Sequence, residues 1–345
     1  MRSIVFILIG VVFFISCRKD QPPVKSTFNG TITSGQRVFI SCEGTFPQNK
    51  AAISLYDPTT GNVVEDIYRP NNNNQSLGDV CQSVYIHNNS LYGVVNNSNK
   101  VVVLDKETFQ RTATISGLQS PRYFLPVSNS KAYVSDIYAN AISVIDLSTN
   151  AKTGSIPCNG WTEEMALSYG KVFVCNIKRA YVYVINSISN VVTDSIYVGY
   201  GSSSIVKDKN EKLWVACSGD SAKSSLPCIV RIDPVSNVVE QSFTFSHYND
   251  SPSNIKINGA GDKLYYLNSN VYGLDITAST LSFSPIVLQG NKVFYGIGIN
   301  PNNEDIYVAD AINYIQNGKV MIYDKQGTFK SSFSVGIIPG SIFFE

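Results

Sequence analysis

The sequence predicts an all-β protein, a seven-bladed β-propeller with four-stranded blades. A unit typified by residues 131–157 (KAYVSDIYANAISVIDLSTNAKTGSIP) recurs seven times, and a repeat of roughly 40 to 50 residues is typical of propellers and solenoids. The copies are rich in Val, Ile, Tyr and Phe and are bounded by Asn, Gly, Ser or Pro, as short strands are. No part of the chain beyond the N-terminus keeps a 3.6-residue apolar period, which excludes repeats of helix pairs.

Two recurring positions set the repeat. One strand of each unit carries an aromatic residue, and a later strand ends at Asp or Asn. The aromatic residues are Phe39, Tyr92, Tyr133, Phe173, Trp214, Tyr265 and Tyr307, and the strand ends are Asp57, Asp105, Asp146, Asn186, Asp233, Asp275 and Asp324. About four short strands fit in each unit, as in a propeller blade. We interpret the Asp and Asn as turn formers, because their side chains bond to nearby backbone.

The two ends of the chain predict how the ring closes. A middle unit has an inner strand at residues 123–127, whereas the first unit begins at Arg37 with no inner strand before it. The last residues, 339–345 (PGSIFFE), have the pattern of an inner strand. Because an open ring would leave bare sheet edges, we expect the C-terminal strand to complete the first blade.

The N-terminus predicts export and a lipid anchor. Arg2 precedes an apolar run over residues 4–15, too short to span a membrane, that ends at Ser16-Cys17. We expect a lipoprotein signal peptide over 1–16, lipidated Cys17 and a tether over 17–27, and the propeller over 28–345. The alternative is an ordinary signal peptide followed by an unrelated cysteine. Arg18-Lys19-Asp20 resembles surface-export tags of Gram-negative lipoproteins, which favours the outer membrane, at the cell surface.

The net charge bears on nucleic-acid binding, and the cysteines bear on disulfide formation. A net charge of +1 provides no basic footprint, so nucleic-acid binding is not expected. Six cysteines follow Cys17, and an even number in an oxidising compartment suggests disulfides. Their places in the repeat predict the pairs Cys217–Cys228, Cys158–Cys175 and Cys42–Cys81. The alternative is six packed thiols.

One rim of the predicted ring is the candidate binding surface. Short turns occupy one rim, and the loops of variable length, at 43–50, 69–79, 218–227, 246–252 and 311–318, fall on the other. Variable loops on a rigid scaffold are where function concentrates. Aromatic and cationic side chains there suit a large, flat, partly anionic ligand, or else they cap the core. The candidate ligand-binding residues are Phe46, Arg69, Arg122, Tyr138, Trp161, Arg179, Tyr200, Tyr248 and Tyr314, with Lys178 and Lys223 as further cations.

No catalytic constellation is visible. The chain has two histidines, no HExxH, no GxSxG and no P-loop. Three SxxK matches, at 128–131, 168–171 and 253–256, fall on turns or a strand instead of a helix start and are interpreted as chance. We therefore predict no catalytic residue, no metal ligand and no cofactor. A metal held by carboxylates at the pore, as in propeller lactonases, stays open as an alternative.

The first two units carry a family resemblance. Residues 38–61 (VFISCEGTFPQNKAAISLYDPTTG) and 76–105 (SLGDVCQSVYIHNNSLYGVVNNSNKVVVLD) resemble the YncE-like propellers of bacterial secreted and surface proteins, especially their lipoprotein branch. Cys42 stands where that branch usually has Asn before Glu43, which fits a family-specific disulfide. Some members capture a corrinoid or an iron–siderophore and pass it to a TonB-dependent outer-membrane transporter. The family motif marks blade architecture, so the resemblance implies no binding residue.

Taken together, we expect a lipid-anchored envelope propeller that binds a corrinoid or ferric siderophore as cargo on its loop-rich rim for a TonB-dependent transporter. Two alternatives stay open. One is a propeller that only binds other envelope proteins. The other is an enzyme, a hydrolase, lyase or quinoprotein-like dehydrogenase with a metal at the pore. Fold alone does not choose among them.

Overall fold

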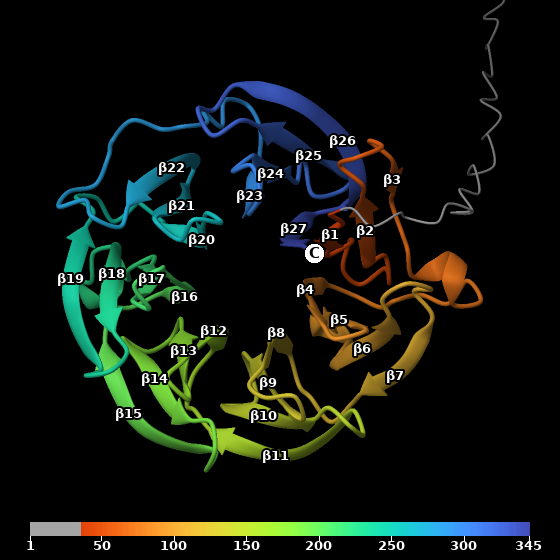
Figure 1. The fold of residues 1–345 in the computed structure, drawn as a ribbon, viewed down its shortest axis with the longest axis horizontal. Coiled ribbons are helices and arrows are strands. Elements are labelled where there is room, and N and C mark those ends of the chain that lie inside the picture. The colour runs from red at the N-terminus through yellow and green to blue at the C-terminus, as the bar shows by residue number, and fades with distance from the viewer. Residues whose placement is uncertain (1–35) are drawn as a thin grey trace, which may run out of the picture. The chain divides into compact units, whose positions relative to one another are not determined.

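The computed structural model describes residues 36–345, and the structural statements below concern that part of the chain. The predicted signal peptide, Cys17, the tether and residues 28–35 lie outside the described residues. The described residues form 27 β-strands in seven antiparallel sheets around a central channel (Figure 1). The predicted seven-bladed β-propeller is confirmed.

The blades are numbered along the chain, and their strands are given from the channel outwards. Blade 1 contains β27 (Pro339–Phe344), β1 (Val38–Cys42), β2 (Ala52–Tyr56) and β3 (Val63–Val64); blade 2 contains β4 (Cys81–His87), β5 (Ser90–Val95), β6 (Lys100–Asp105) and β7 (Arg111–Ile115); blade 3 contains β8 (Pro121–Pro126), β9 (Lys131–Asp136), β10 (Ala141–Asp146) and β11 (Ala151–Pro157). Blade 4 contains β12 (Thr162–Ser168), β13 (Lys171–Asn176), β14 (Tyr181–Asn186) and β15 (Val191–Tyr197); blade 5 contains β16 (Ser202–Lys207), β17 (Leu213–Cys217), β18 (Cys228–Asp233) and β19 (Val238–Thr244). Blade 6 contains β20 (Ser253–Ile257), β21 (Lys263–Asn268) and β22 (Asn270–Asp275); blade 7 contains β23 (Phe294–Ile299), β24 (Ile306–Asp310), β25 (Asn317–Tyr323) and β26 (Phe329–Ile337).

Three short 3-10 helices, η1 (Arg69–Asn71), η2 (Asn96–Ser98) and η3 (Ser221–Lys223), lie in loops. Within residues 36–345, no helix has the length and hydropathy needed to cross a membrane.

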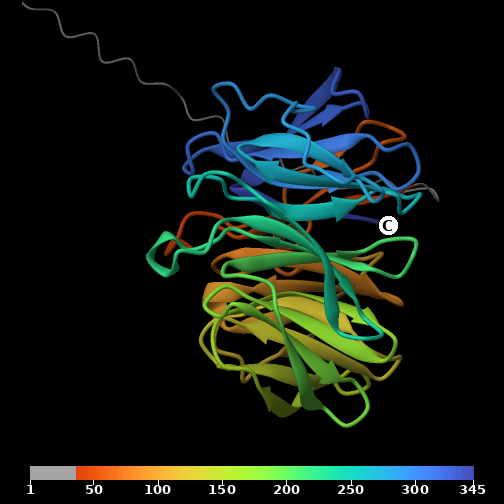
Figure 2. The same ribbon diagram turned by 90° about the vertical axis from the view of Figure 1, so that its left-hand side faces the viewer.

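The strands run between two rims of different character (Figure 2). The turn rim carries the turns between the first and second and between the third and fourth strands of each blade. The loop rim carries the loops between the second and third strands and the crossovers between blades. The long segments, such as residues 43–51, 65–80, 218–227 and 245–252, are on the loop rim, where the repeat predicts them.

Apolar side chains on both faces of each sheet hold the ring together. Phe39 packs in the core between blades 1 and 2, whereas the next residue, Ile40, packs in the core between blades 7 and 1. Alternation along β1 explains this, since successive side chains point to opposite faces of a sheet. Seven such cores, one per pair of neighbouring blades, bury most of the Val, Ile, Tyr and Phe of the repeat.

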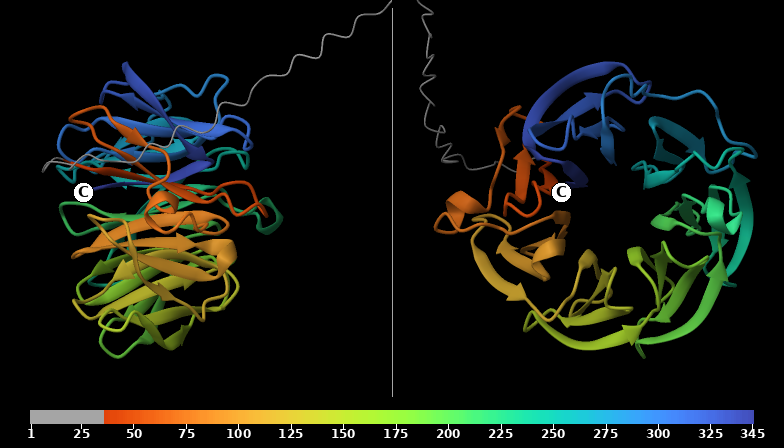
Figure 3. Two further views of the ribbon diagram at one scale, coloured as in Figure 1. Left: turned by 90° about the vertical axis from the view of Figure 1, so that its right-hand side faces the viewer. Right: turned by 180° about the vertical axis from the view of Figure 1, so that it is seen from behind.

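The C-terminal strand closes the ring, as the chain ends predict. β27 pairs with β1, with Val38 opposite Phe344 and Ile40 opposite Ile342, and Figure 3 shows the last strand beside the first. Charged groups reinforce the junction on the turn rim. Glu345 accepts from Lys106 Nζ at 2.7 Å and from Arg37, whose side chain is nearly buried. The first and last segments of the ring are therefore joined by both a β-ladder and ion pairs.

Blade 6 departs from the repeat. It has three strands, and the place of its fourth strand is held by a single bridge between Val271 and Val287. The segment after β22 reads ITASTLSFSPIVL over residues 276–288. It lacks a sustained alternation, and Pro285 cannot donate to a ladder. The segment therefore crosses the outer edge of the blade without forming a strand.

The Asp or Asn at the end of the third strand makes the same hydrogen bond to the backbone in every blade. Its Oδ1 accepts the backbone N–H two residues later, at N···O distances of 2.7–3.3 Å. The seven donors are the N–H groups of Thr59, Glu107, Ser148, Ile188, Val235, Thr277 and Gln326. The interpretation of these residues as turn formers is confirmed.

The structure corrects the predicted disulfides. Cys42, Cys81, Cys158, Cys175, Cys217 and Cys228 are all buried free thiols. Two of the predicted pairs fail because their members face different cores. Cys42 and Cys158 each lie in a different inter-blade core from their expected partners, Cys81 and Cys175.

The third predicted pair is correctly placed but not bonded. Cys217 and Cys228 stand opposite each other on β17 and β18. The Cys228 thiol donates to the carbonyl of Val198 at 3.3 Å. Neighbouring position in the repeat predicted proximity here, but it did not establish a bond.

Candidate ligand-binding site

The channel wall is built from one irregularity repeated seven times. Each inner strand slips in register against the second strand of its blade, close to the start of the inner strand. The slips fall at Cys81/Ser83, Pro121/Phe124, Thr162/Met165, Ser202/Ser204, Ser253/Lys256 and Phe294/Gly296, and in β27 between Pro339 and Ile342. Such bulges leave residues outside the ladder and re-aim their side chains. The bulged residues are therefore available to line the channel.

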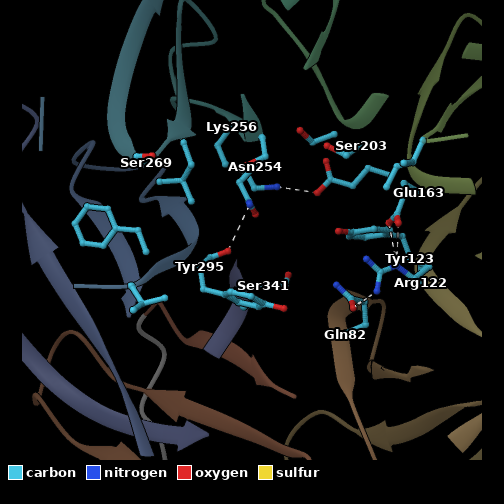
Figure 4. Close-up of a pocket in the computed structure, with 18 of the residues that line it drawn as sticks. Gln82, Arg122, Tyr123, Glu163, Ser203, Asn254, Lys256, Ser269, Tyr295 and Ser341 are labelled. Carbon is cyan, nitrogen blue, oxygen red and sulfur yellow. Dashed lines mark hydrogen bonds and ion pairs between the residues drawn. The ribbon is translucent and has the colours of Figure 1, made fainter. Parts of the chain in front are cut away.

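A cavity of about 500 Å³ occupies the loop-rim end of the channel. All seven inner strands contribute to it, each through at least one bulged residue. The bulged residues in the lining are Gln82, Arg122, Tyr123, Glu163, Glu164, Ser203, Asn254, Tyr295, Gly340 and Ser341. Figure 4 shows Arg122 between Gln82 and Glu163 on one side of the cavity. The volume lies within the ordinary range of small-molecule sites.

The most buried charge in the wall belongs to an ion pair between blades 3 and 4. Arg122 Nε lies 3.1 and 3.0 Å from the two carboxylate oxygens of Glu163, and Arg122 Nη1 donates to Gln82 Oε1. The Glu163 side chain is only 3% exposed. Burial raises the pKa of Glu163, Arg122 opposes that rise, and the neighbouring Glu164 adds to it. Since a guanidinium keeps its proton, Glu163 is the member of the pair that titrates.

A second ion pair lies in the same wall. Lys256 Nζ on β20 lies 2.9 Å from Glu164 Oε1 on β12, and the other oxygen of Glu164 accepts the N–H of Ile205 at 3.1 Å. The cavity thus contains two cations and two carboxylates, each cation held by one carboxylate. A ligand that carries both anionic groups for the cations and amide donors for the carboxylates could exchange for these partners without leaving a charge unpaired.

Tyrosines of blade 7 form an aromatic part of the wall. The Tyr295 and Tyr314 rings meet edge to face with centroids 6.0 Å apart. Tyr295 Oη donates to Glu43 Oε1 at 2.8 Å. Burial raises the pKa of the Glu43 carboxyl, although the Tyr295 hydroxyl and the charge of Arg122 lower it. The cavity therefore combines ionic and aromatic surfaces.

Two of the nine predicted binding residues lie in this cavity, Arg122 and Tyr314. Phe46, Tyr138, Arg179 and Tyr248 are exposed on the loop rim. Arg69 pairs with Asp66 at 3.6 Å, and Tyr200 is half-buried. None of these six, nor Trp161, is among the residues that line the cavity.

Three of the rim residues form a separate cluster on blades 3 and 4. The Tyr138 and Trp161 rings meet edge to face at 5.8 Å, and Lys178 Nζ lies 4.3 Å from the centre of the Trp161 ring. Lys178 covers one face of the Trp161 indole, so that face is already taken by a contact within the protein. The other additional cation, Lys223, is exposed in η3.

Sequence reasoning missed most of the cavity wall, including Gln82, Glu163, Glu164, Asn254, Lys256 and Tyr295. One signal was present: Glu163 and Glu164 are consecutive charged residues in a strand that continues with the apolar run Met165-Ala166-Leu167. Strict alternation would place one of them in a core, so adjacent charges point to a bulge. The SxxK match at 253–256 has no helix start of the kind that motif needs, but Ser253 and Lys256 both line the cavity.

Comparisons with known proteins agree with the fold. Residues 36–337 match the family described as "Domain of unknown function (DUF5074)". No curated protein matches the chain by sequence.

Solved structures provide fold-level relatives. A putative 6-phosphogluconolactonase from Bacteroides fragilis is 12% identical, with a TM-score of 0.70 over 92% of this chain and 100% of that one. A quinonprotein alcohol dehydrogenase-like protein from Bacteroides thetaiotaomicron is 14% identical, with a TM-score of 0.69 over 90% of this chain and 78% of that one. Apo AztD from Citrobacter koseri is 11% identical, with a TM-score of 0.57 over 90% of this chain and 98% of that one. At such identities the likeness shows the fold alone.

Proposed function

This seven-bladed propeller belongs to the DUF5074 family, whose description assigns no function. We propose a function from the shape and the chemistry of its channel. The protein is a lipid-anchored envelope propeller that binds a small molecule in the channel mouth on its loop rim. The observation that carries this proposal is the cavity of about 500 Å³ to which all seven inner strands contribute. A site built from bulges on rigid strands holds its polar groups in fixed positions, which favours binding.

The wall chemistry favours a polar ligand with a flat or unsaturated part. Arg122 and Lys256 match carboxylate or phosphate groups, Glu163 and Glu164 match amide donors, and Tyr295 offers an aromatic surface. A corrinoid carries amides around a flat ring, and ferric siderophores carry charged and carbonyl oxygens. Either would place part of its surface in the cavity and part across the loop rim. The resemblance of residues 38–105 to YncE-like lipoproteins supports the same cargo and a TonB-dependent outer-membrane transporter as the receiving partner.

The enzyme alternative with a pore metal would draw on the carboxylates of Glu163 and Glu164, and both are engaged in ion pairs. Within residues 36–345, no group of three or more His, Cys, Asp or Glu side chains is placed to hold a metal ion. The fold-level relatives include proteins titled as a putative lactonase, a dehydrogenase-like protein and AztD. Because one fold carries such different titles, these likenesses do not favour any one function for this chain.

Thermal unfolding with a panel of corrinoids, ferric siderophores and haem tests the proposal. A ligand at 100 times its dissociation constant adds about 2.7 kcal/mol to the free energy of unfolding. The same shift should shrink in Lys256→Met, which removes a cation from the cavity. It should persist in Lys209→Met, which removes a surface cation paired with Asp262 at 3.2 Å. A panel without any shift, or equal shifts in both variants, would overturn the channel as the site.

A further inference from the structure

Two neighbouring blades expose apolar residues on the turn rim. Ile188 in blade 4 is 86% exposed, and Val235 in blade 5 is 63% exposed. Both occupy the tip of the turn between the third and fourth strands. At the same position the other five blades have Thr59, Glu107, Ser148, Thr277 and Gln326, all polar. Since the Asp or Asn contact to this residue's N–H is the same in all seven blades, that contact does not require an apolar side chain here.

A third exposed side chain adds to this patch. Tyr169, 61% exposed, lies in the two-residue turn between β12 and β13 with φ +48°. A positive φ is unfavourable for a bulky residue. The matching two-residue turn of blade 2 has Asn88 there, with φ +53°, and asparagine tolerates that conformation well. Neither backbone geometry nor packing accounts for a tyrosine at this tip.

Polar groups around the patch are bonded within the protein. Lys171 stands opposite Asn186 in register, and its Nζ donates to the carbonyl of Val235 at 3.1 Å and to Asn237 Oδ1 at 2.9 Å. Lys131 Nζ likewise donates to Asn190 Oδ1 at 2.9 Å. These bonds join the turns of blades 3, 4 and 5, so the exposed apolar residues belong to neighbouring turns on one rim. We call Tyr169, Ile188 and Val235 the rim patch.

The chain joins the ring on the same rim. Gln36 accepts a hydrogen bond from Asn300, in the turn between β23 and β24, at 2.8 Å, and Arg37 contacts Glu107 in a turn of blade 2. The 19 residue steps from Cys17 to Gln36 can span at most about 68 Å. An anchor at Cys17 would therefore reach the ring through a chain segment that arrives at the turn rim.

We propose that the rim patch docks on the surface of a phospholipid bilayer, with Ile188 and Val235 inserted at the headgroup level and Tyr169 at the interface. This inference rests on the proposed lipid anchor. Exposed aliphatic tips and a tyrosine are the side chains that interfaces favour. Docking in this way points the channel mouth away from the membrane, which is the orientation that captures cargo from the medium. A patch of three tips binds weakly, so the tethered ring can release it and turn toward a transporter.

Site-specific fluorescence tests the docking. The chain from Arg18 onward contains the whole ring and has only buried native cysteines. Ile188→Cys, Val235→Cys and, as the matched control on the loop rim, Ile315→Cys (the native isoleucine is 72% exposed) are each labelled with an environment-sensitive dye. An N-terminal histidine tag tethers the protein to phosphatidylcholine vesicles containing nickel-chelating lipid. This tether makes the test independent of acylation.

We expect nitroxide-labelled lipid to quench the dye at 188 and 235 and to leave the dye at 315 unquenched. Tyr169→Asn combined with Ile188→Ser, residues that other blades use at these positions, should abolish quenching at 235 and leave cargo binding unchanged. Equal quenching at 188 and 315, or none at either, would falsify the docking. Dimerisation of the free chain that Ile188→Ser abolishes would instead assign the patch to self-association and also overturn it. The mass of the mature N-terminus of the full chain tests the anchor separately. If the tagged chain docks but the mature N-terminus carries no acyl group, the anchor proposal fails and the docking stands.

Discussion

Arg122 Nε lies 3.1 and 3.0 Å from the two carboxylate oxygens of Glu163, and the two residues come from the inner strands of neighbouring blades. Both side chains project from bulges into the channel. With Glu163 3% and Arg122 22% exposed, the pair is largely removed from water. A change to this pair should therefore alter the candidate site and also the free energy of unfolding.

Arg122→Met should lower the free energy of unfolding by about 2 to 4 kcal/mol at pH 7, because it leaves the Glu163 carboxylate buried without its partner. Urea denaturation measures this loss. The matched surface variant Lys209→Met, whose ion pair is about half exposed, should cost less than about 1 kcal/mol. Equal losses in the two variants would show that the channel pair is solvated like a surface pair.

Glu43→Gln should stabilise the protein at neutral pH relative to the native chain. Burial raises the folded-state pKa of Glu43 above its ordinary value of 4.5, so the folded state holds this proton more tightly than the unfolded state. The contribution of Glu43 to stability is then fully present below pH 4.5 and is lost as the pH rises through the folded-state pKa. Glutamine is neutral throughout and can still accept from Tyr295. Unfolding free energies of both proteins at pH 4 and pH 7 check this, and a stability difference between variant and native chain that does not grow from pH 4 to pH 7 contradicts it.

Deletion of residues 339–345 should abolish cooperative unfolding and cause aggregation. It removes β27, which pairs with β1, and leaves a bare edge in blade 1. Circular dichroism melts and size-exclusion chromatography measure the outcome. Glu345→Gln is the control, since it keeps the strand and weakens only the contacts with Arg37 and Lys106, at about 1 kcal/mol. A deleted chain that melts like the control would mean that the ring holds without closure.

Alkylation should leave all six cysteines of the ring unmodified in the folded protein at pH 8. All six thiols are buried, which blocks access of the reagent. Burial also raises the pKa of Cys42 and of Cys158 to about 12, which suppresses the reactive thiolate there. In denaturant without reductant, all six should react. Mass spectrometry counts the added groups. Fewer than six in the denatured chain would restore one or more disulfides.

The sequence predicted the ring and its closure because both depend on a local pattern. Alternating Val, Ile and Tyr set each strand, and the Asp or Asn at the end of the third strand forms its own turn. The same pattern predicted four strands for blade 6, which has three, because Pro285 and an irregular run stand in place of the fourth strand. It also placed Cys217 opposite Cys228 without deciding their oxidation state.

The sequence by itself determined the repeat, the number of blades, the rim that carries the long loops and the strand that closes the ring. Only the tertiary structure decided which side chains meet in the channel. Arg122, Glu163, Lys256 and Tyr295 come from four strands far apart in sequence, and they converge only when the ring closes. Their direction depends on a register slip between paired strands, and a slip is a property of two strands together that neither strand encodes alone.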